Sequence, residues 1–189
     1  MPVTVIRFLS RNPYKLQEAQ RILEFANVTI RPVNSTIEEL QTENVDHLIR
    51  DKALKAFKKV GRPVFVEHTG LYLAQLGGLP GGLTQIFWDR LLADRFAEMF
   101  GTGSNTDVEA KTVIGYIDGR QLHMFSGSIR GRIASEPRGP RGFQWDCVFI
   151  PDGERETFAE MGARKDDISM RRRALDQLAT HLAGHHRIT

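Results

Sequence analysis

Residues 3–16 read Val-Thr-Val-Ile-Arg-Phe-Leu-Ser-Arg-Asn-Pro-Tyr-Lys-Leu, and this stretch indicates the type of fold. Its first seven residues are largely β-branched and apolar, which is typical of a buried strand. Asn12 is a favourable N-cap and Pro13 suits the first position of a helix, so a helix is predicted to begin there. A strand that runs almost directly into a helix is the pattern of an α/β protein.

The rest of the chain continues this alternation and then changes to a hairpin. Further strands are predicted where the chain is apolar and β-branched: residues 28–33, 64–66, 108–117 and 122–133. The third of these meets the fourth at Asp118-Gly119, a strong hairpin signal. Further helices are predicted after Asn44, over residues 84–100, and from a cap at Asp166 or Asp167 onward. Residues 77–82, with four glycines and a proline, are predicted to be a loop.

This order of elements predicts the α/β class with an elongated mixed sheet, flanking helices and two lobes. The length of 189 residues suits one domain, and 41% hydrophobic residues suffice for a sizeable core. We therefore expect a single domain over residues 1–189.

The charge distribution excludes several classes of function. A net charge of +3 without a dense basic stripe does not favour nucleic-acid binding. Four arginines between residues 130 and 141 are interpreted as a solvated loop, although an anionic small molecule would also suit them.

No apolar run of about 18 residues is present, so no membrane span is expected. The chain has a single cysteine, Cys147, so it cannot form an intrachain disulfide. Because Cys147 lies in an apolar run, we expect it to have a packing role. A lone cysteine is typical of a reducing compartment, so a cytoplasmic location is expected.

The start of the first helix is a candidate anion site. The free N–H groups of a helix that follows a strand attract negative charge, and Ser10, Asn12 and Lys15 add a hydroxyl, an amide and a cation. A well-capped helix with a solvated lysine explains this segment equally simply and is the commoner case. The glycines of a Walker A loop are absent.

Two basic residues occupy the apolar faces of predicted helices. Lys52 lies seven residues after Val45, and Arg171 lies four residues before Leu175, so both are expected to face inward. One such residue can extend out of a core edge. Two on separate helices predict a cleft lined with positive charge, which suits a polyphosphate.

Acidic and aromatic residues supply the other candidates. Glu39 lies in a predicted loop and Glu67 ends a predicted strand, so the two carboxylates could share a Mg²⁺ with phosphate oxygens. Residues 143–146 (Phe-Gln-Trp-Asp) could stack on a base and bind its edge, or form a core strand followed by a turn.

Taken together, these segments resemble the inosine triphosphate pyrophosphatase family, which cleaves inosine and xanthosine triphosphates to the monophosphate and pyrophosphate. The resemblance spans nearly the whole chain, and its motifs occur in the family's order: residues 10–15 (S-R-N-P-Y-K), 39–41 (E-L-Q), Lys52, 67–71 (E-H-T-G-L), 76–81 (L-G-G-L-P-G), 145–153 (W-D-C-V-F-I-P-D-G), 157–161 (T-F-A-E-M) and 169–171 (S-M-R).

The resemblance implies a role for each matching residue. Ser10, Asn12, Lys15 and Lys52 would hold the triphosphate, with Lys52 close to the reaction, and Thr69 and Gly70 would also contact the substrate. Glu39 and Glu67 would bind Mg²⁺, or Mn²⁺ as an alternative. Phe143 would stack on the purine, with Trp145, Asp146, Lys165 and Arg171 nearby. The family fold has a nucleotide cleft between two lobes, and its members are usually homodimers.

The chain departs from the family at three positions. His68 replaces an aspartate, Met170 replaces a histidine beside the base, and Gln85 replaces a lysine seen in some members. Neutral imidazole can act as a general base near pH 7, but it is a poorer Mg²⁺ ligand than oxygen. The main hypothesis is therefore a pyrophosphatase in which His68 acts as base or orients the water. A related enzyme with a shifted nucleotide substrate, and a nucleotide-binding protein with impaired catalysis, are the alternatives.

Overall fold

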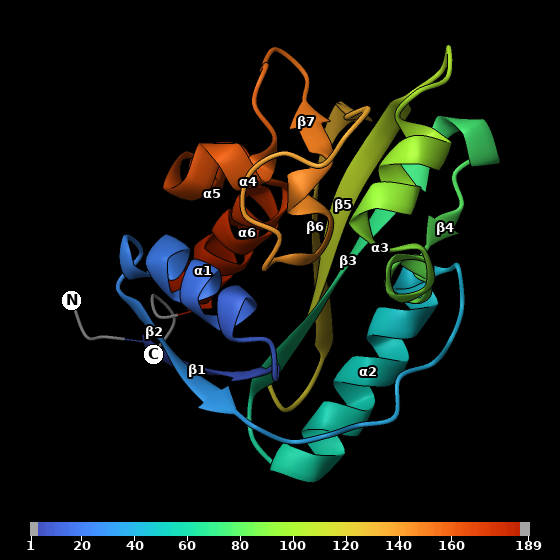
Figure 1. The fold of residues 1–189 in the computed structure, drawn as a ribbon. Helices are drawn as coiled ribbons and strands as arrows, with labels where there is room; N and C mark the ends of the chain where they lie inside the picture. The colour runs from blue at the N-terminus through green and yellow to red at the C-terminus, as the bar shows by residue number, and fades with distance from the viewer. Residues whose placement is uncertain (1–3, 186–189) are drawn as a thin grey trace.

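The computed structural model describes residues 4–185, and Val3 of the first predicted strand lies outside them (Figure 1). A seven-stranded sheet has the order β2-β1-β3-β5-β6-β7, with β4 paired to β3. The strands are β1 (Thr4–Leu9), β2 (Val28–Val33), β3 (Val64–Leu73), β4 (Pro80–Gly81), β5 (Asp107–Ile117), β6 (Leu122–Ile133) and β7 (Phe149–Pro151).

Helices flank this sheet on both faces. They are α1 (Pro13–Glu24), α2 (Val45–Val60), α3 (Thr84–Phe100), α4 (Phe158–Met161), α5 (Lys165–Ile168) and α6 (Met170–His185), with 3₁₀ turns η1 (Ala74–Leu76), η2 (Gln144–Cys147) and η3 (Gly162–Arg164). Strands β1, β2 and β3 are parallel and the other pairings are antiparallel, so the predicted mixed α/β class is confirmed. None of the helices within residues 4–185 is long and apolar enough to cross a membrane.

Strand β3 is longer than the sequence predicts. It continues past residue 66 to Leu73, so Glu67 lies inside the strand and does not end it. The reason is long-range pairing, because β3 pairs with β5 along its whole length, from Val64 opposite Ile117 to Leu73 opposite Val108. A neighbouring strand satisfies the backbone of polar residues that local composition would not assign to a strand.

Two other boundaries differ from the prediction. The last helix is not capped by Asp166 or Asp167, because residues 165–168 form the separate short helix α5 and Asp166 pairs with Arg21. Helix α6 begins at Met170, where the Ser169 hydroxyl accepts a hydrogen bond from the Arg172 N–H. The predicted loop of residues 77–82 contains β4, which joins the edge of β3.

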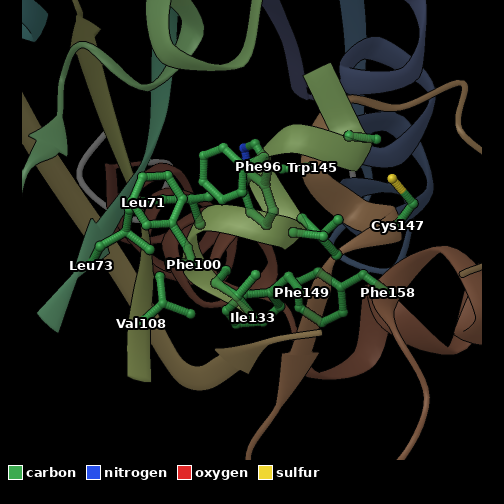
Figure 2. Packing of buried hydrophobic residues seen from close by; sticks show 14 of the residues in the cluster. Leu71, Leu73, Phe96, Phe100, Val108, Ile133, Trp145, Cys147, Phe149 and Phe158 are labelled. Atoms are coloured by element: carbon green, nitrogen blue, oxygen red, sulfur yellow. The ribbon is translucent and has the colours of Figure 1, made fainter. Parts of the chain in front are cut away.

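The core consists of three apolar clusters along the long strands β3, β5 and β6. One lies between the sheet and helices α1 and α6, and a second lies under α2 on the opposite face. The third surrounds α3 at the other end of these strands, and Figure 2 shows Phe96, Phe149 and Phe158 within it. Cys147 is fully buried in this third cluster, which confirms its predicted packing role.

The connections of the parallel strands create a crevice. After β1 the chain passes through α1 to β2 on one side, and after β2 it passes through α2, over the opposite face, to β3 on the other side of β1. Strands β1 and β3 pair only at Arg7 and Phe8 with Val64 and Phe65, so they separate toward their carboxyl ends. Such switch points in parallel sheets are where ligands bind.

Candidate active site

A cavity of about 640 Å³ lies at the carboxyl end of β1 and beside the middle of β3. Its walls come from the loop after β1, the loop before α2, α2 itself, β3, the start of α3 and η2. Nine of the residues predicted from the sequence line it: Ser10, Asn12, Lys15, Glu39, Lys52, Glu67, His68, Thr69 and Trp145. The structure thus brings together residues that are up to 135 positions apart in the chain.

The start of α1 forms one wall of this cavity, and Asn12 is its cap as predicted. The Asn12 Oδ1 accepts hydrogen bonds from the backbone N–H groups of Tyr14 and Lys15 at 3.0 and 3.3 Å. The Ser10 hydroxyl accepts one from the Asn12 N–H at 3.3 Å. Of the two alternatives from the sequence, the capped helix is present, and Ser10, Asn12 and Lys15 at its start also line the cavity.

Glu67 is a buried carboxylate held by two cations. The guanidinium of Arg171 donates to both of its oxygens at 2.8 and 3.1 Å, and the Lys15 Nζ lies 3.1 Å from Oε1. Burial raises the pKa of Glu67, but Arg171 and Lys15 lower it by more, to about 2. Glu67 is therefore ionised at neutral pH despite being only 2% exposed.

Lys52 faces inward as predicted and connects two acidic positions. Its Nζ lies 2.8 Å from the Glu39 carboxylate and donates to the backbone carbonyl of Glu67 at 3.1 Å. Burial raises the pKa of Glu39, while Lys52 lowers it to a value below its ordinary one. The cavity therefore has two ionised carboxylates and two lysines on its walls.

The donor set fits a hard divalent cation that takes part of its shell from a ligand. Two carboxylates with phosphate oxygens and waters are the usual surroundings of Mg²⁺ in phosphate chemistry. Within residues 4–185 no group of three or more His, Cys, Asp or Glu residues is arranged to hold a metal by itself.

His68 faces the cavity from the other side of β3. Successive residues of a strand point to opposite faces. Phe65 packs in the α1/α6 cluster and Val66 in the α2 cluster, so Glu67 faces α1 and α6 while His68 faces α2. The His68 Nε2 is buried and has no hydrogen-bond partner in the described part of the protein. Burial, then Lys15 and Lys52, lower the pKa of His68 to about 3, so its ring is neutral at pH 7.

A second cavity, of about 230 Å³, is lined by other residues of α1 than the first. Phe143, Asp146 and Lys165, three of the predicted base-contacting residues, line it together with Tyr14 and Glu18. The Lys165 Nζ lies 2.7 Å from Asp146 and 3.3 Å from Glu18, and it stands 4.3 Å above the centroid of the Phe143 ring.

A chain of buried ion pairs connects the two cavities. Arg171 is 1% exposed, lines neither cavity, and binds Glu67 with one edge of its guanidinium and Glu18 with the other. Glu18 in turn pairs with Lys165. Charges at the large cavity are thus linked to charges at the small one through Arg171 and Glu18. This position between the cavities agrees with the prediction that Arg171 faces inward.

Gly70 has a packing role in the structure. A side chain at residue 70 would place its Cβ 2.4 Å from the carbonyl oxygen of Gly81, so only glycine lets β3 and β4 approach each other. Gly70 is not among the residues that line the two cavities described above, although its neighbour Thr69 is.

A model of the Ham1 family matches residues 6–181, which is almost the whole described chain. The chain belongs to the Ham1 family. This membership agrees with the resemblance that the ordered motifs indicate, and the fold and the cavity lie within the matched region.

Curated Ham1 relatives are similar over nearly their full length. A protein of Methanopyrus kandleri named dITP/XTP pyrophosphatase is 35% identical over 92% of this chain and 94% of its own. A Trypanosoma cruzi protein named inosine triphosphate pyrophosphatase 1 is 36% identical over 93% of this chain and 91% of its own. Among solved structures, a HAM1 protein from Coxiella burnetii superposes with a TM-score of 0.80 at 27% identity, covering 96% of this chain and 99% of the other.

Sequence reasoning missed Glu18 at this Ham1 site and gave no role to Gln85 or Gln144. Glu18 lies on the apolar face of α1, four residues before Ile22, and is 3% exposed. The inward-facing argument that identifies Lys52 and Arg171 would also have found it. Gln144 donates a hydrogen bond to Gln85 at the wall of the large cavity. No local pattern indicates that pair, because its members are 59 positions apart.

Proposed function

We propose that this chain hydrolyses aberrant purine nucleoside triphosphates, such as ITP, XTP and dITP, to the monophosphate and pyrophosphate. The observation that carries the proposal is the large cavity, where two lysines and two ionised carboxylates meet the start of a capped helix. That combination suits a triphosphate with a divalent cation. The names of the Ham1 relatives support the choice of substrate.

In this proposal the triphosphate lies in the large cavity. Ser10 and Asn12 at the start of α1 meet phosphate oxygens, and Lys15 and Lys52 neutralise their charge. Both lysines now pair with carboxylates, so a bound triphosphate would compete for them and release Glu67 and Glu39 oxygens. Thr69 lines the same wall and offers a hydroxyl to the substrate.

Glu39 and Glu67 would hold Mg²⁺ between the protein and the phosphates. The cation would supply positive charge where negative charge develops, which is a large contribution in phosphoryl chemistry. If the His68 nitrogen also approaches the cation, Mn²⁺ would be accepted more readily than in an all-oxygen site. Arg171 would keep Glu67 ionised and in place.

His68 would orient the attacking water. A group with a pKa of about 3 is a weak proton acceptor at pH 7, since an efficient general base has a pKa near the working pH. Its buried Nε2 without a protein partner can still form a hydrogen bond with water in the cavity. The chemistry then depends mainly on position and on charge neutralisation by the lysines.

The proposal is tested by incubating purified protein with ITP, XTP, dITP, ATP and GTP in the presence of Mg²⁺ or Mn²⁺. Pyrophosphate and the matching monophosphate are measured together. We expect release from the first three at rates at least about tenfold above those for ATP and GTP, and His68→Ala is expected to lower kcat by about 10²-fold if His68 positions the water. The absence of pyrophosphate release from every nucleotide would contradict the proposal.

The low pKa of His68 also favours a second candidate, a nucleotide-binding protein with little turnover. This candidate predicts that ITP raises the melting temperature without being hydrolysed. His68→Asp would then create activity in an inert protein. An enzyme with a shifted substrate is distinguished by its turnover profile across the nucleotide panel. A homodimer and a cytoplasmic location are further proposals that rest on the resemblance and on the lone cysteine.

A further inference from the structure

Tyr14 covers the ring of Phe143, the residue on which the family resemblance would stack the purine base. Its side chain stacks on Phe143 with ring centroids 5.3 Å apart and planes inclined by 20°. Both rings line the small cavity, next to Asp146 and Lys165. Neither the ordered motifs nor the proposed mechanism gives Tyr14 a task.

Tyr14 belongs to a helix turn that borders both cavities. It lies in the first turn of α1, where its N–H is capped by Asn12 and its neighbour Lys15 points into the large cavity. One turn of helix therefore presents a cation to the large cavity and an aromatic ring to the small one. A nucleotide with its phosphates in the large cavity and its base in the small one would pass across this turn.

Tyr14 is the more exposed member of the ring pair. Its side chain is 48% exposed, and its hydroxyl lies over Gly142, where a Cβ would come within 2.9 Å of it. Phe143 is held more firmly, because Lys165 stands 4.3 Å above its ring and is itself fixed by Asp146 and Glu18. An aromatic base can lie between the two rings only if their centroids separate beyond the 5.3 Å at which they lie. Tyr14 would move outward to allow this separation.

We propose that Tyr14 is a specificity-determining residue, whose ring and that of Phe143 form a clamp that takes the purine base between them. This inference rests on the proposed function, because it needs a purine nucleotide as ligand, and the family resemblance implies that the purine lies beside Phe143. A two-ring base overlaps both aromatic rings more than a one-ring base does, so the clamp favours purines over pyrimidines. In the free protein the two rings cover each other.

The test measures equilibrium binding by calorimetry, without turnover. The probes are inosine monophosphate, uridine monophosphate and inorganic tripolyphosphate, and the variants are Tyr14→Ala and Tyr14→Phe. Phe25→Ala is the matched control, because Phe25 is an exposed aromatic residue at the other end of α1. We expect Tyr14→Ala to weaken inosine monophosphate binding about tenfold. Tyr14→Phe and Phe25→Ala should change it less than about twofold, and tripolyphosphate binding should be unchanged in all variants.

Several results would overturn the clamp. Unchanged or tighter inosine monophosphate binding by Tyr14→Ala would show that the ring is inert or blocks the base. An equal loss of tripolyphosphate binding would assign the effect to the helix start, and a loss in Tyr14→Phe would assign it to the hydroxyl. Failure of the wild-type protein to prefer inosine over uridine monophosphate would also overturn it. Intact clamp behaviour without hydrolysis of any triphosphate would contradict the proposed function alone.

Discussion

At the scale of a single residue, Arg171 compensates the charges of two buried carboxylates. It is buried between Glu18 and Glu67, and its guanidinium donates to both carboxylates. Taking three charges out of water is costly, and the cost is offset only while every charge keeps its partner. The residue therefore contributes to stability as well as holding Glu67 at the cavity.

Replacement of this residue is expected to destabilise the protein strongly. Arg171→Met leaves Glu18 and Glu67 facing each other with less compensation, and we expect a loss of about 3–5 kcal/mol of unfolding free energy. Arg172→Met is the control, because Arg172 pairs with Asp176 one turn along the helix and is partly exposed. It should cost less than about 1 kcal/mol. Urea unfolding at pH 7 measures both, and a similar loss in the two variants would contradict the argument.

At the scale of elements, the β5–β6 hairpin depends on its turn. The Asp118 Oδ1 accepts hydrogen bonds from the backbone N–H groups of Arg120 and Gln121, and its Oδ2 lies 2.9 Å from His123. Burial raises the pKa of Asp118, but the two backbone hydrogen bonds and His123 lower it by more. Its pKa therefore lies well below the ordinary value.

This lowered pKa predicts a pH-dependent contribution to stability. A carboxylate whose pKa is lower in the folded than in the unfolded chain stabilises fully above the unfolded value of about 3.9, and this contribution is lost as the pH falls below that value. Asp118→Asn keeps an acceptor but cannot titrate. We expect the wild-type protein to be more stable than this variant by about 1 kcal/mol at pH 7, since the group is partly solvated. The difference should shrink toward pH 3 in urea unfolding, and a constant difference would contradict this assignment.

At the scale of the whole molecule, the strands β3, β5 and β6 pass through all three apolar clusters. The two ends of the molecule share these strands and the ion pairs around Arg171. A domain connected in this way should unfold in one cooperative transition, although the cavity separates its ends.

The chain offers a direct test of this cooperativity. Both tryptophans, Trp88 and Trp145, belong to or pack against the α3 cluster, whereas Leu178 is fully buried in the α1/α6 cluster. Leu178→Ala should cost about 2–5 kcal/mol. If the ends unfold together, this change shifts the tryptophan fluorescence transition as much as the circular dichroism transition. A tryptophan transition that keeps its wild-type midpoint would show that the α3 end unfolds independently.

The sequence alone predicted much of the element order and several site residues. The apolar periodicity and the capping residues Asn12 and Asn44 indicated the helices, because these signals act within one or two turns. The same periodicity identified Lys52 and Arg171 as inward-facing charges. The Asp118-Gly119 pair predicted the hairpin from its turn chemistry.

Only the tertiary structure decided which of these residues meet. Arg171 binds Glu67 and Glu18 across 104 and 153 positions of chain, and Tyr14 covers Phe143 from another element altogether. The extension of β3 through Glu67 likewise depends on β5 as its partner. Periodicity and capping report the local preference of a segment, whereas ion pairs, ring stacking and strand pairing depend on segments that come together only when the chain folds.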